Sequence, residues 1–480
     1  MADSKKILWY NLAFMAFSSV WGFGNVVNGF AKYGGLQAIF TWILMFALYF
    51  VPYALMVGEL GSAFKNLGGG VSSWIHEMIN PKVAFFAGWT YWVVHMPYIS
   101  QKPQQALNAV SWVITGDGKF FSSLDPLVLQ LGCLALFLVI VLIATRGINP
   151  LKNLATLAGS SMFVMSMLFI LLMMAAPAIV GDKIQSIDWS LKTFIPTFDM
   201  KYFTSFSILV FAVGGCERIS PYVNKMKDPA KGFPKGMIAL AVMVATTAIL
   251  GTIAMGMMFN PDNIPNDLLL NGAYYCFQQL GEYYGVGNLF LIIYALANTI
   301  GQLSVLIVSI DAPLRMLLDN ADQKYIPNGL LKQNDKGVYI NGYLLVTILV
   351  SILIIVPALG VGNVNDMFNW LIELNAVCLP LRYLWVFVAY IALKRAGQKF
   401  TADYRFTKNK TLGLLIGGWC FFFTAYACIG GMIPKIPAGS SEYTFQLIAN
   451  IITPIILLGL GVIMPMIAKK TNKEVQQVTK

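Results

Sequence analysis

The chain has 480 residues, of which 57% are hydrophobic and 11% are charged, whereas soluble domains carry charge on about a quarter of their residues. This composition excludes a soluble globular protein. No polar linker divides the chain, so we expect a single membrane domain spanning residues 1–480. We attribute the formal net charge of +11 to membrane topology and contact with membrane lipids, and expect no nucleic acid partner.

A helix that crosses a bilayer needs about 20 predominantly apolar residues. Twelve segments meet this criterion: residues 7–31, 37–60, 83–114, 126–145, 154–180, 202–222, 235–259, 287–318, 342–358, 367–393, 411–433 and 443–468. The sequence therefore predicts an all-α polytopic membrane protein. Its six cysteines are scattered singly without CxxC spacing, so we expect no disulfide framework, no metal site and no cofactor.

Lys and Arg predict the orientation, because they concentrate in the cytoplasmic loops of membrane proteins. With the N-terminus inside, 24 of the 33 Lys and Arg residues fall on the cytoplasmic side and 6 on the outer side. The remaining three, Lys102, Arg218 and Arg382, lie well inside the spans and away from their ends. We therefore predict a multi-pass protein of the plasma (inner) cell membrane with both termini in the cytoplasm.

Two spans contain glycine and polar residues at a depth where a simple lipid anchor would be uninterrupted. In the first span, residues 18–25 read SSVWGFGN, and in the sixth, residues 214–218 read GGCER. These spans occupy corresponding positions in the two halves of a five-plus-five repeat. Paired breaks of this kind indicate a transporter binding site, because irregular backbone at membrane depth must be buried or line a wet cavity.

Several motifs resemble those of the amino acid-polyamine-organocation (APC) superfamily. Residues 53–60 (YALMVGEL) and 68–74 (GGGVSSW) are similar to its second-helix signature. Residues 211–217 (FAVGGCE) and 224–229 (NKMKDP) resemble its sixth helix and the loop that follows, and residues 309–315 (SIDAPLR) resemble its eighth helix. The details are closest to the glutamate:γ-aminobutyrate antiporter branch.

The resemblance implies a fold of twelve transmembrane helices, the LeuT-like five-plus-five inverted repeat, with helices 1 and 6 unwound. It places the first repeat at about residues 7–180 and the second at about residues 202–393. Accessory helices 11 and 12 are expected at about residues 411–468.

Helix breaks at these positions can satisfy both charges of an amino acid, which bare hydrocarbon cannot. Free N–H groups at the start of a half-helix attract a carboxylate, and freed carbonyls accept from an ammonium. The predicted contacts are Gly22, Phe23 and Gly24 for the carboxylate, and Ser18, Ser19, Val213, Gly214 and Gly215 for the ammonium. The alternative is that these glycines only pack helices together, but the matched positions of the breaks favour binding.

The resemblance also implies an aromatic gate. Phe211 lies six residues before Glu217, where the superfamily places an aromatic ring over the bound solute. Trp21 and Phe23 can close the other side of the substrate. The alternative for each ring is packing against lipid or core, since 13% of the chain is aromatic.

Ionisable residues inside a membrane are costly and are therefore functional candidates. Glu217 and Arg218 are adjacent and must point in different directions. Glu217 resembles the superfamily acid that supports the broken sixth helix, or else it carries a proton. Arg218 either lines the cavity or pairs with Glu373 or Asp311, and we favour the pair.

Three of the remaining charged candidates, Lys102, Glu59 and Arg315, have two interpretations each. Lys102 lies in a polar part of the third span, where it contacts an anionic substrate side chain or extends into the outer vestibule. Glu59 and Arg315 lie near the cytoplasmic ends of their helices, where gate salt bridges or a solvated face are expected. Asp311 lies one turn deeper, and Glu373 can face the cavity.

We predict an amino acid antiporter, which exchanges one amino acid for another or for its decarboxylation product by alternating access. The alternative is a proton-coupled amino acid or amine symporter. An enzyme is not expected, because the chain has 2 His residues and neither an HExxH nor a GxSxG motif. Lys102 and Arg218 favour an anionic substrate side chain, whereas Asp311 and Glu373 favour a cationic one.

Overall fold

The computed structural model describes residues 7–67, 70–146, 149–181, 184–260, 263–318, 322 and 324–478. The side chains of residues 18, 19, 149–160, 312, 398 and 473–478 lie outside this description. Regular structure in the described residues is almost entirely helical, as predicted. Ten of the described helices are long and apolar enough to cross a membrane.

The helices follow one another with short connections. The first half contains α1 (Trp9–Val20), α2 (Phe23–Lys32), α3 (Ala38–Met45), the π-helical turn η2 (Phe46–Phe50), α4 (Val51–Ala63), α5 (Gly70–Met78), α6 (Pro81–Val93), α7 (Met96–Thr115), α8 (Lys119–Ser122), α9 (Pro126–Thr145) and α10 (Asn149–Ile179). The second half contains α11 (Leu191–Phe194), α12 (Met200–Thr204), α13 (Phe206–Val213), the 3-10 helix η4 (Cys216–Lys225), α14 (Pro229–Gly256), α15 (Leu268–Tyr283), α16 (Leu289–Leu318), α17 (Ile340–Ile355), α18 (Val364–Cys378), the 3-10 turn η8 (Leu379–Arg382), α19 (Tyr383–Ala396), α20 (Lys410–Gly431) and α21 (Ser441–Val478).

Ten of the twelve predicted spans correspond to the ten long helices, and the other two are each divided into a pair of shorter helices. The first predicted span consists of α1 and α2, and the third consists of α6 and α7. The division of the third span was not predicted. Pro97, the second residue of α7, lacks the N–H group that would continue α6 into α7.

The first and sixth spans are unwound at the predicted positions. Between α1 and α2, Trp21 and Gly22 have extended backbones. Between α13 and η4, Gly214 is extended and Gly215 has a φ of +104°, which residues with a Cβ atom rarely adopt. Backbone groups at these interruptions leave the regular helical hydrogen-bond pattern and become available to other partners.

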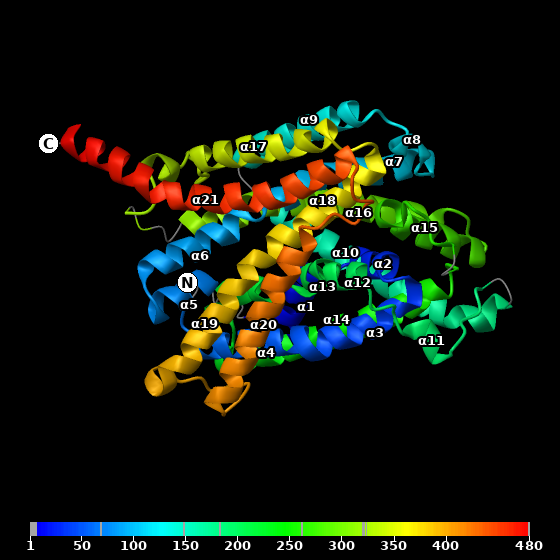
Figure 1. The fold of residues 1–480 in the computed structure, drawn as a ribbon, viewed down its shortest axis with the longest axis horizontal. Coiled ribbons are helices and arrows are strands. Elements are labelled where there is room, and N and C mark those ends of the chain that lie inside the picture. The colour runs from blue at the N-terminus through cyan, green and yellow to red at the C-terminus, as the bar shows by residue number, and fades with distance from the viewer. Residues whose placement is uncertain are drawn as a thin grey trace.

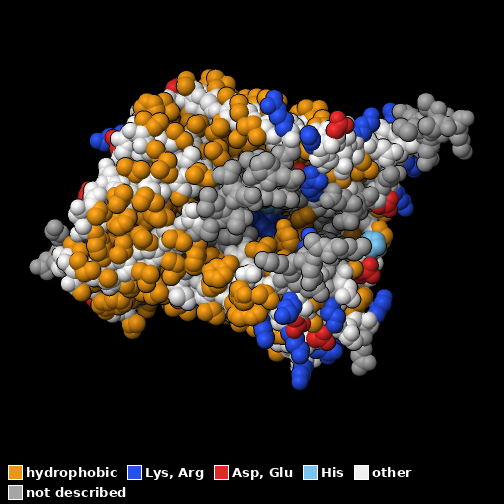
Figure 2. All heavy atoms as spheres, turned by 180° about the vertical axis from the view of Figure 1, so that it is seen from behind, with side chains coloured by type: hydrophobic (Ala, Val, Ile, Leu, Met, Phe, Trp, Pro, Cys, Tyr) orange, Lys and Arg blue, Asp and Glu red, His pale blue; other side chains and the backbone are white. Residues whose placement is uncertain are grey.

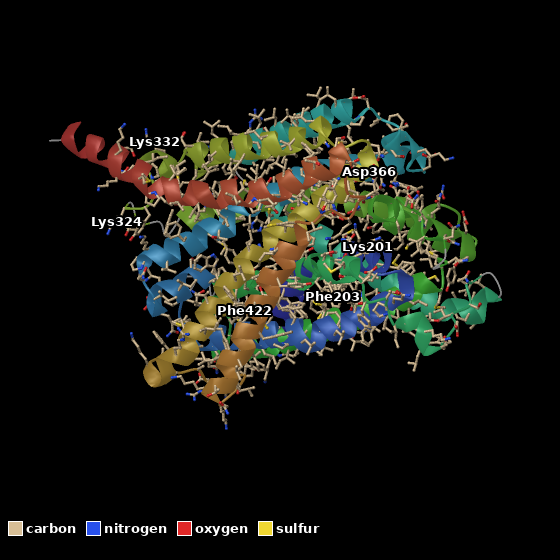
Figure 3. All side chains as sticks on the ribbon, in the orientation of Figure 1. Lys201, Phe203, Lys324, Lys332, Asp366 and Phe422 are labelled. Atoms are coloured by element: carbon tan, nitrogen blue, oxygen red, sulfur yellow. The ribbon has the colours of Figure 1, made fainter. Side chains whose placement is uncertain are left out.

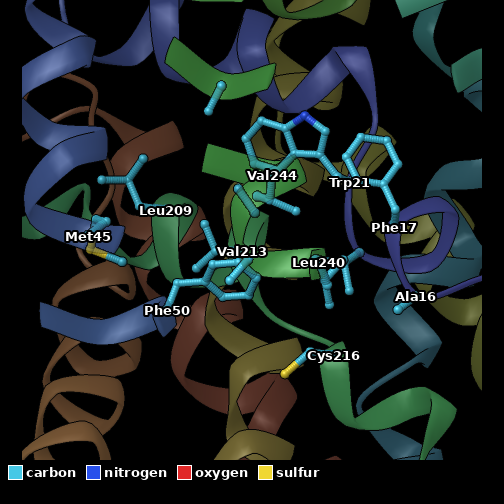
Figure 4. Packing of buried hydrophobic residues seen from close by; sticks show 14 of the residues in the cluster. Ala16, Phe17, Trp21, Met45, Phe50, Leu209, Val213, Cys216, Leu240 and Val244 are labelled. Carbon is cyan, nitrogen blue, oxygen red and sulfur yellow. The ribbon is translucent and has the colours of Figure 1, made fainter. Parts of the chain in front are cut away.

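The two breaks lie in the middle of the helix bundle. The first half-helix, α1, packs against α14, η4 and α10, and α13 packs against α18, α20 and α2. In Figure 1, α9 and α17 run along one side of the bundle and α4 along the opposite side, with α1 and α13 between them. Figure 4 shows Trp21 and Val213 among the buried side chains that pack these elements together. Val213 can therefore offer a substrate only its backbone.

Basic side chains gather at one end of the molecule. Figure 2 shows Lys and Arg at this end and hydrophobic side chains over most of the remaining face. Both chain termini lie at the same end (Figure 1), as do Lys324 and Lys332, whereas Lys201 and Asp366 lie toward the other end (Figure 3). The termini thus share one side of the molecule, and its assignment to the cytoplasm stays a prediction from the sequence.

Candidate functional site

Asn25 connects the two breaks. Its Nδ2 atom donates to the carbonyl oxygen of Val20 at 3.4 Å and to that of Ala212 at 3.2 Å. Val20 ends α1, and Ala212 lies in the last turn of α13. One side chain therefore satisfies carbonyl groups from both interrupted helices and keeps them together. Asn25 falls within the first predicted break, but no role was predicted for it.

Open space borders the first turn of α2. A Cβ atom on Gly22 or Gly24 would meet no atom of the described residues within 4 Å, and Gly24 is exposed although its neighbour Phe23 is buried. Phe23 and Gly24 begin α2, so their N–H groups have no acceptor within the helix and form its positive end. The backbones of Ser18 and Ser19 belong to the last turn of α1, but their side chains lie outside the described residues.

The glycines of the second break allow close packing. A Cβ atom on Gly214 would lie 2.1 Å from the ring of Tyr383. A Cβ atom on Gly215 would lie 3.2 Å from Arg382 Nη2 and 3.3 Å from Arg218 Nε. The missing side chains let one ring and two guanidinium groups approach the backbone. Gly214 is thus tightly packed, as expected for a glycine that only packs helices together, whereas Gly22 and Gly24 are not.

Glu217 is fully buried and connects η4 to two other elements. Its Oε2 atom accepts a hydrogen bond from the Tyr53 hydroxyl of α4. Its Oε1 atom lies 3.4 Å from Arg382 Nε of η8, and neither charged side chain is exposed. Removing one partner of such a buried pair leaves an uncompensated charge and is strongly destabilising. These contacts suit the supporting role predicted for Glu217.

Arg382 lies at the centre of a buried network, although no role was predicted for it. Its Nη1 atom lies 2.7 Å from His95 Nε2, and His95 Nδ1 lies 2.7 Å from the carbonyl oxygen of Tyr91. Because a carbonyl only accepts, Nδ1 carries the proton and Nε2 accepts from the guanidinium. A neutral His95 therefore holds Arg382 in place. The guanidinium also lies over the rings of Tyr91 and Tyr383, at 5.4 and 5.0 Å.

Arg218 and Lys102 both lie over the ring of Tyr98. The distances to the ring centroid are 5.9 Å from the Arg218 guanidinium carbon and 4.2 Å from Lys102 Nζ. Lys102 donates to Gln105 Oε1 at 2.7 Å and to Gln302 Oε1 at 3.1 Å, and is only 7% exposed. Lys102 thus lies inside the bundle and does not extend into an outer vestibule.

We call the group formed by Arg218, Arg382, Lys102 and Glu217 the central charge cluster. Among the described side chains that these contacts join, it has three cations and one carboxylate. The cluster therefore has an excess of positive charge next to the second break. In Figure 2, Lys or Arg atoms are also visible at the base of a hollow in the surface.

The other intramembrane carboxylates lie elsewhere. Glu373 of α18 pairs with Lys32 at the end of α2, at 2.7 Å, and Asp311 pairs with Arg315 one turn along α16, also at 2.7 Å. The predicted pairing of Arg218 with Glu373 or Asp311 is therefore wrong, because both carboxylates have nearer cationic partners. Lys32 follows the first predicted span, so its approach to Glu373 was not predicted. Arg315 and Asp311 both belong to α16, but Arg315 Nη2 also donates to the Gly337 carbonyl oxygen at 2.9 Å and Asp311 accepts from the Tyr343 hydroxyl of α17 at 2.9 Å.

Glu59 connects α4 to α19 and to the loop before α20. Its Oε1 atom lies 2.5 Å from Lys394 Nζ, and its Oε2 atom accepts from the Tyr390 hydroxyl at 3.2 Å and from the Phe406 N–H at 3.0 Å. Lys394 also donates to the Thr407 carbonyl at 2.8 Å. Of the two alternatives for Glu59, the structure thus shows a buried salt bridge between helices.

The predicted gate aromatics differ in their surroundings. Trp21 is 6% exposed and packs edge-on against Trp42, with ring centroids 5.4 Å apart. Phe23 packs in the same way against Phe169, at 4.8 Å. These two rings belong to the core, which was the alternative interpretation. Phe211 is only partly buried, so it keeps an accessible edge beside the second break.

Sequence reasoning missed four residues of this site: Asn25, Tyr53, His95 and Arg382. Asn25 and Arg382 had a signal, since Asn25 lies in a predicted break and Arg382 is one of three Lys or Arg residues well inside the spans. Tyr53 and His95 had no such signal, because one polar aromatic residue in a span is compatible with simple packing.

A helical membrane bundle in which two interrupted helices meet beside buried charges is the architecture of a transporter. The fold is similar to that of MhsT in complex with L-phenylalanine, with a TM-score of 0.57 and 15% sequence identity. The similarity covers 89% of this chain and 99% of that chain. The predicted LeuT-like fold is thereby confirmed.

The chain belongs to the amino acid permease family of the APC superfamily, whose family model matches residues 7–459. It is 51% identical over 476 residues to the aspartate/glutamate permease AcaP of Lactococcus lactis subsp. cremoris (strain MG1363), covering 98% of this chain and 97% of that protein. It is 24% identical to the glutamate/gamma-aminobutyrate antiporter of Lactococcus lactis subsp. lactis (strain IL1403), covering 86% of this chain and 81% of that protein. The chain is therefore a multi-pass amino acid permease and not an enzyme.

Proposed function

We propose that this permease carries the acidic amino acids aspartate and glutamate and exchanges them by alternating access. The central charge cluster is the observation that carries the proposal, because it contains three cations and, among the described side chains that its contacts join, a single carboxylate. A dicarboxylic amino acid has a net charge of −1 and compensates part of this excess, which a neutral or cationic amino acid cannot do. The 51% identical relative AcaP, an aspartate/glutamate permease, agrees with this substrate class.

Each charged group of such a substrate has a partner. The α-carboxylate accepts from the N–H groups of Phe23 and Gly24, where the missing Cβ atom of Gly24 leaves open space. The ammonium donates to backbone carbonyls at the ends of α1 and α13. The side-chain carboxylate binds Arg218. Lys102, which lies over the same Tyr98 ring as Arg218, adds positive potential.

Two ion pairs are suited to close the pathway alternately. Lys32 and Glu373 join α2 to α18 at one level, and Glu59 and Lys394 join α4 to α19 at another. In this scheme α1, α2, α13 and η4 move relative to the other helices, within repeats at about residues 7–180 and 202–393. Helices α20 and α21 are accessory, and both termini face the cytoplasm.

Counterflow into proteoliposomes tests substrate and mechanism together. Vesicles loaded with unlabelled L-aspartate or L-glutamate should accumulate labelled L-aspartate, and empty vesicles should not. Excess external L-glutamate should abolish accumulation, whereas L-lysine and L-leucine should have little effect. Equal inhibition by L-glutamate, L-lysine and L-leucine would contradict an acidic substrate.

A proton-coupled symporter is the second candidate, because the name of the 51% identical relative, aspartate/glutamate permease, does not specify exchange. Empty vesicles under an inward proton gradient distinguish the two. Uptake that a protonophore abolishes supports symport, and uptake only into loaded vesicles supports exchange.

A further inference from the structure

A second cationic site lies far from the helix breaks in sequence, where α19, α20 and their connecting loop meet. A cavity of about 160 Å³ opens between these elements. Its wall contains Lys394, Arg405, Lys408 and Lys410, together with the apolar side chains of Leu393 and Phe400. The cavity therefore combines four cations with an apolar surface.

The acidic residues near this cavity are already paired. Glu59, which also lines it, binds Lys394 through one oxygen, and its other oxygen accepts from Tyr390 and Phe406. Asp403 in the same loop pairs with Lys65 at 2.8 Å.

The remaining cations of the wall lack such partners. Arg405, Lys408 and Lys410 are exposed, and none of the ion pairs among the described residues includes them. Three uncompensated cations therefore converge on one small cavity, which is the environment that an anion such as a phosphate group binds.

An exposed apolar face begins next to this cavity and continues along α20. Its residues recur every three or four positions, as expected for one side of a helix. They are Leu412 (47% exposed), Leu415 (66%), Trp419 (50%), Phe422 (71%), Tyr426 (45%) and Ile429 (65%). Phe422, about halfway along α20, is labelled in Figure 3. In a membrane this face meets the acyl chains of lipids.

We propose that this cavity binds the phosphate of an anionic phospholipid whose acyl chains lie along the exposed face of α20. The cations alone would serve a free phosphate equally well, but the adjoining apolar face favours a lipid. Because Glu59 and Lys394 belong to the same cavity wall, the bound headgroup stabilises the junction of α4 and α19. The proposal does not depend on which amino acid is transported.

The test compares two triple variants of the purified full-length protein in detergent. Arg405→Gln/Lys408→Gln/Lys410→Gln removes the cavity cations, and Lys324→Gln/Lys332→Gln/Lys336→Gln removes three exposed lysines from the loop before α17. The probes are phosphatidylglycerol, phosphatidylcholine and inorganic phosphate. The readouts are native mass spectrometry of bound lipid and the shift in Tm.

Phosphatidylglycerol should bind the wild type and the control variant and raise their Tm. Its affinity for the cavity variant should fall by at least about tenfold, because that variant loses three basic residues that attract an anionic lipid. Phosphatidylcholine should give a smaller shift that is equal in all three proteins. Equal loss of phosphatidylglycerol binding in both triple variants would overturn the proposal, because it would indicate a general charge effect. The same Tm shift with inorganic phosphate alone would overturn the assignment to a lipid.

Discussion

The glycines at the two breaks differ in what surrounds their missing side chains. A Cβ atom on Gly24 meets no atom of the described residues within 4 Å, so a valine there can be accommodated without displacing the core. Its methyl groups would nevertheless fill the space assigned to the substrate. We expect Gly24→Val to abolish exchange with unchanged expression and Tm, measured by counterflow and thermal unfolding. Gly418→Val is the control, because Gly418 also has open space but lies on α20. Exchange at the wild-type rate in Gly24→Val would rule out this site.

The proposed acidic specificity depends most directly on Arg218. Ligand at about 100 times its Kd stabilises a protein by about 2.7 kcal/mol, which a thermal shift detects. We expect L-aspartate and L-glutamate to raise the Tm of the wild type and to have no effect on Arg218→Met. Lys102→Met should weaken the protection, and Lys324→Met should leave it intact. Undiminished protection in Arg218→Met would show that the side-chain carboxylate binds elsewhere.

Single residues were predictable where their type is rare in the environment. Glycines and charges inside apolar spans attract attention, so Gly22, Gly24, Arg218 and Glu217 were identified from the sequence. Partners were not predictable, because a pairing such as Lys32 with Glu373 joins positions 341 residues apart. Only the packing of the helices brings such residues together.

The link between α2 and α18 depends on the pair Lys32 and Glu373, whose side chains are only 15% and 8% exposed. We expect Lys32→Ala and Glu373→Ala each to slow exchange and lower Tm, and the double variant to resemble the single variants, because both remove the same interaction. The exposed pair Lys65 and Asp403 is the control, and its loss should change Tm very little. Additive effects of the two substitutions would show that the residues act independently.

The loop between α20 and α21 adds a titratable group near this pair. Burial lowers the pKa of Lys435 to about 8, while Glu373 opposes the shift and Lys32 adds to it. Since the unfolded chain keeps a proton on this lysine up to about pH 10.5, it binds more protons than the folded protein between these values, and stability rises with pH there. We expect Lys435→Met to reduce the rise in Tm between pH 8 and pH 10, relative to the wild type and to Lys324→Met. An identical rise in all three proteins would contradict this effect.

At the scale of helices, continuous apolar runs predicted the ten long helices, and the glycine and polar residues within two of the predicted spans predicted the breaks in the first and sixth. The division between α6 and α7 was missed, because apolar length alone does not show where Pro97 interrupts a helix. The 3-10 turn η8 was missed for the same reason. This turn contains Pro380 and ends at Arg382, whose guanidinium lies beside Glu217.

For the whole molecule, composition indicated a membrane protein and the order of motifs indicated the superfamily. The sequence left open the charge of the substrate, because it contains candidates of both signs. The structure separates them: Asp311 and Glu373 pair with Arg315 and Lys32, whereas Arg382 pairs with Glu217, and Arg218 and Lys102 lie over the ring of Tyr98. The proposed preference for an acidic substrate thus rests on the arrangement of charges and not on their number.

A cryo-electron microscopy structure of the permease saturated with L-aspartate tests the central claim most directly. Density for the amino acid is expected between the two breaks, with its α-carboxylate at the N–H groups of Phe23 and Gly24 and its side-chain carboxylate at Arg218. Bound L-aspartate that touches neither the start of α2 nor the central charge cluster would contradict the proposed site.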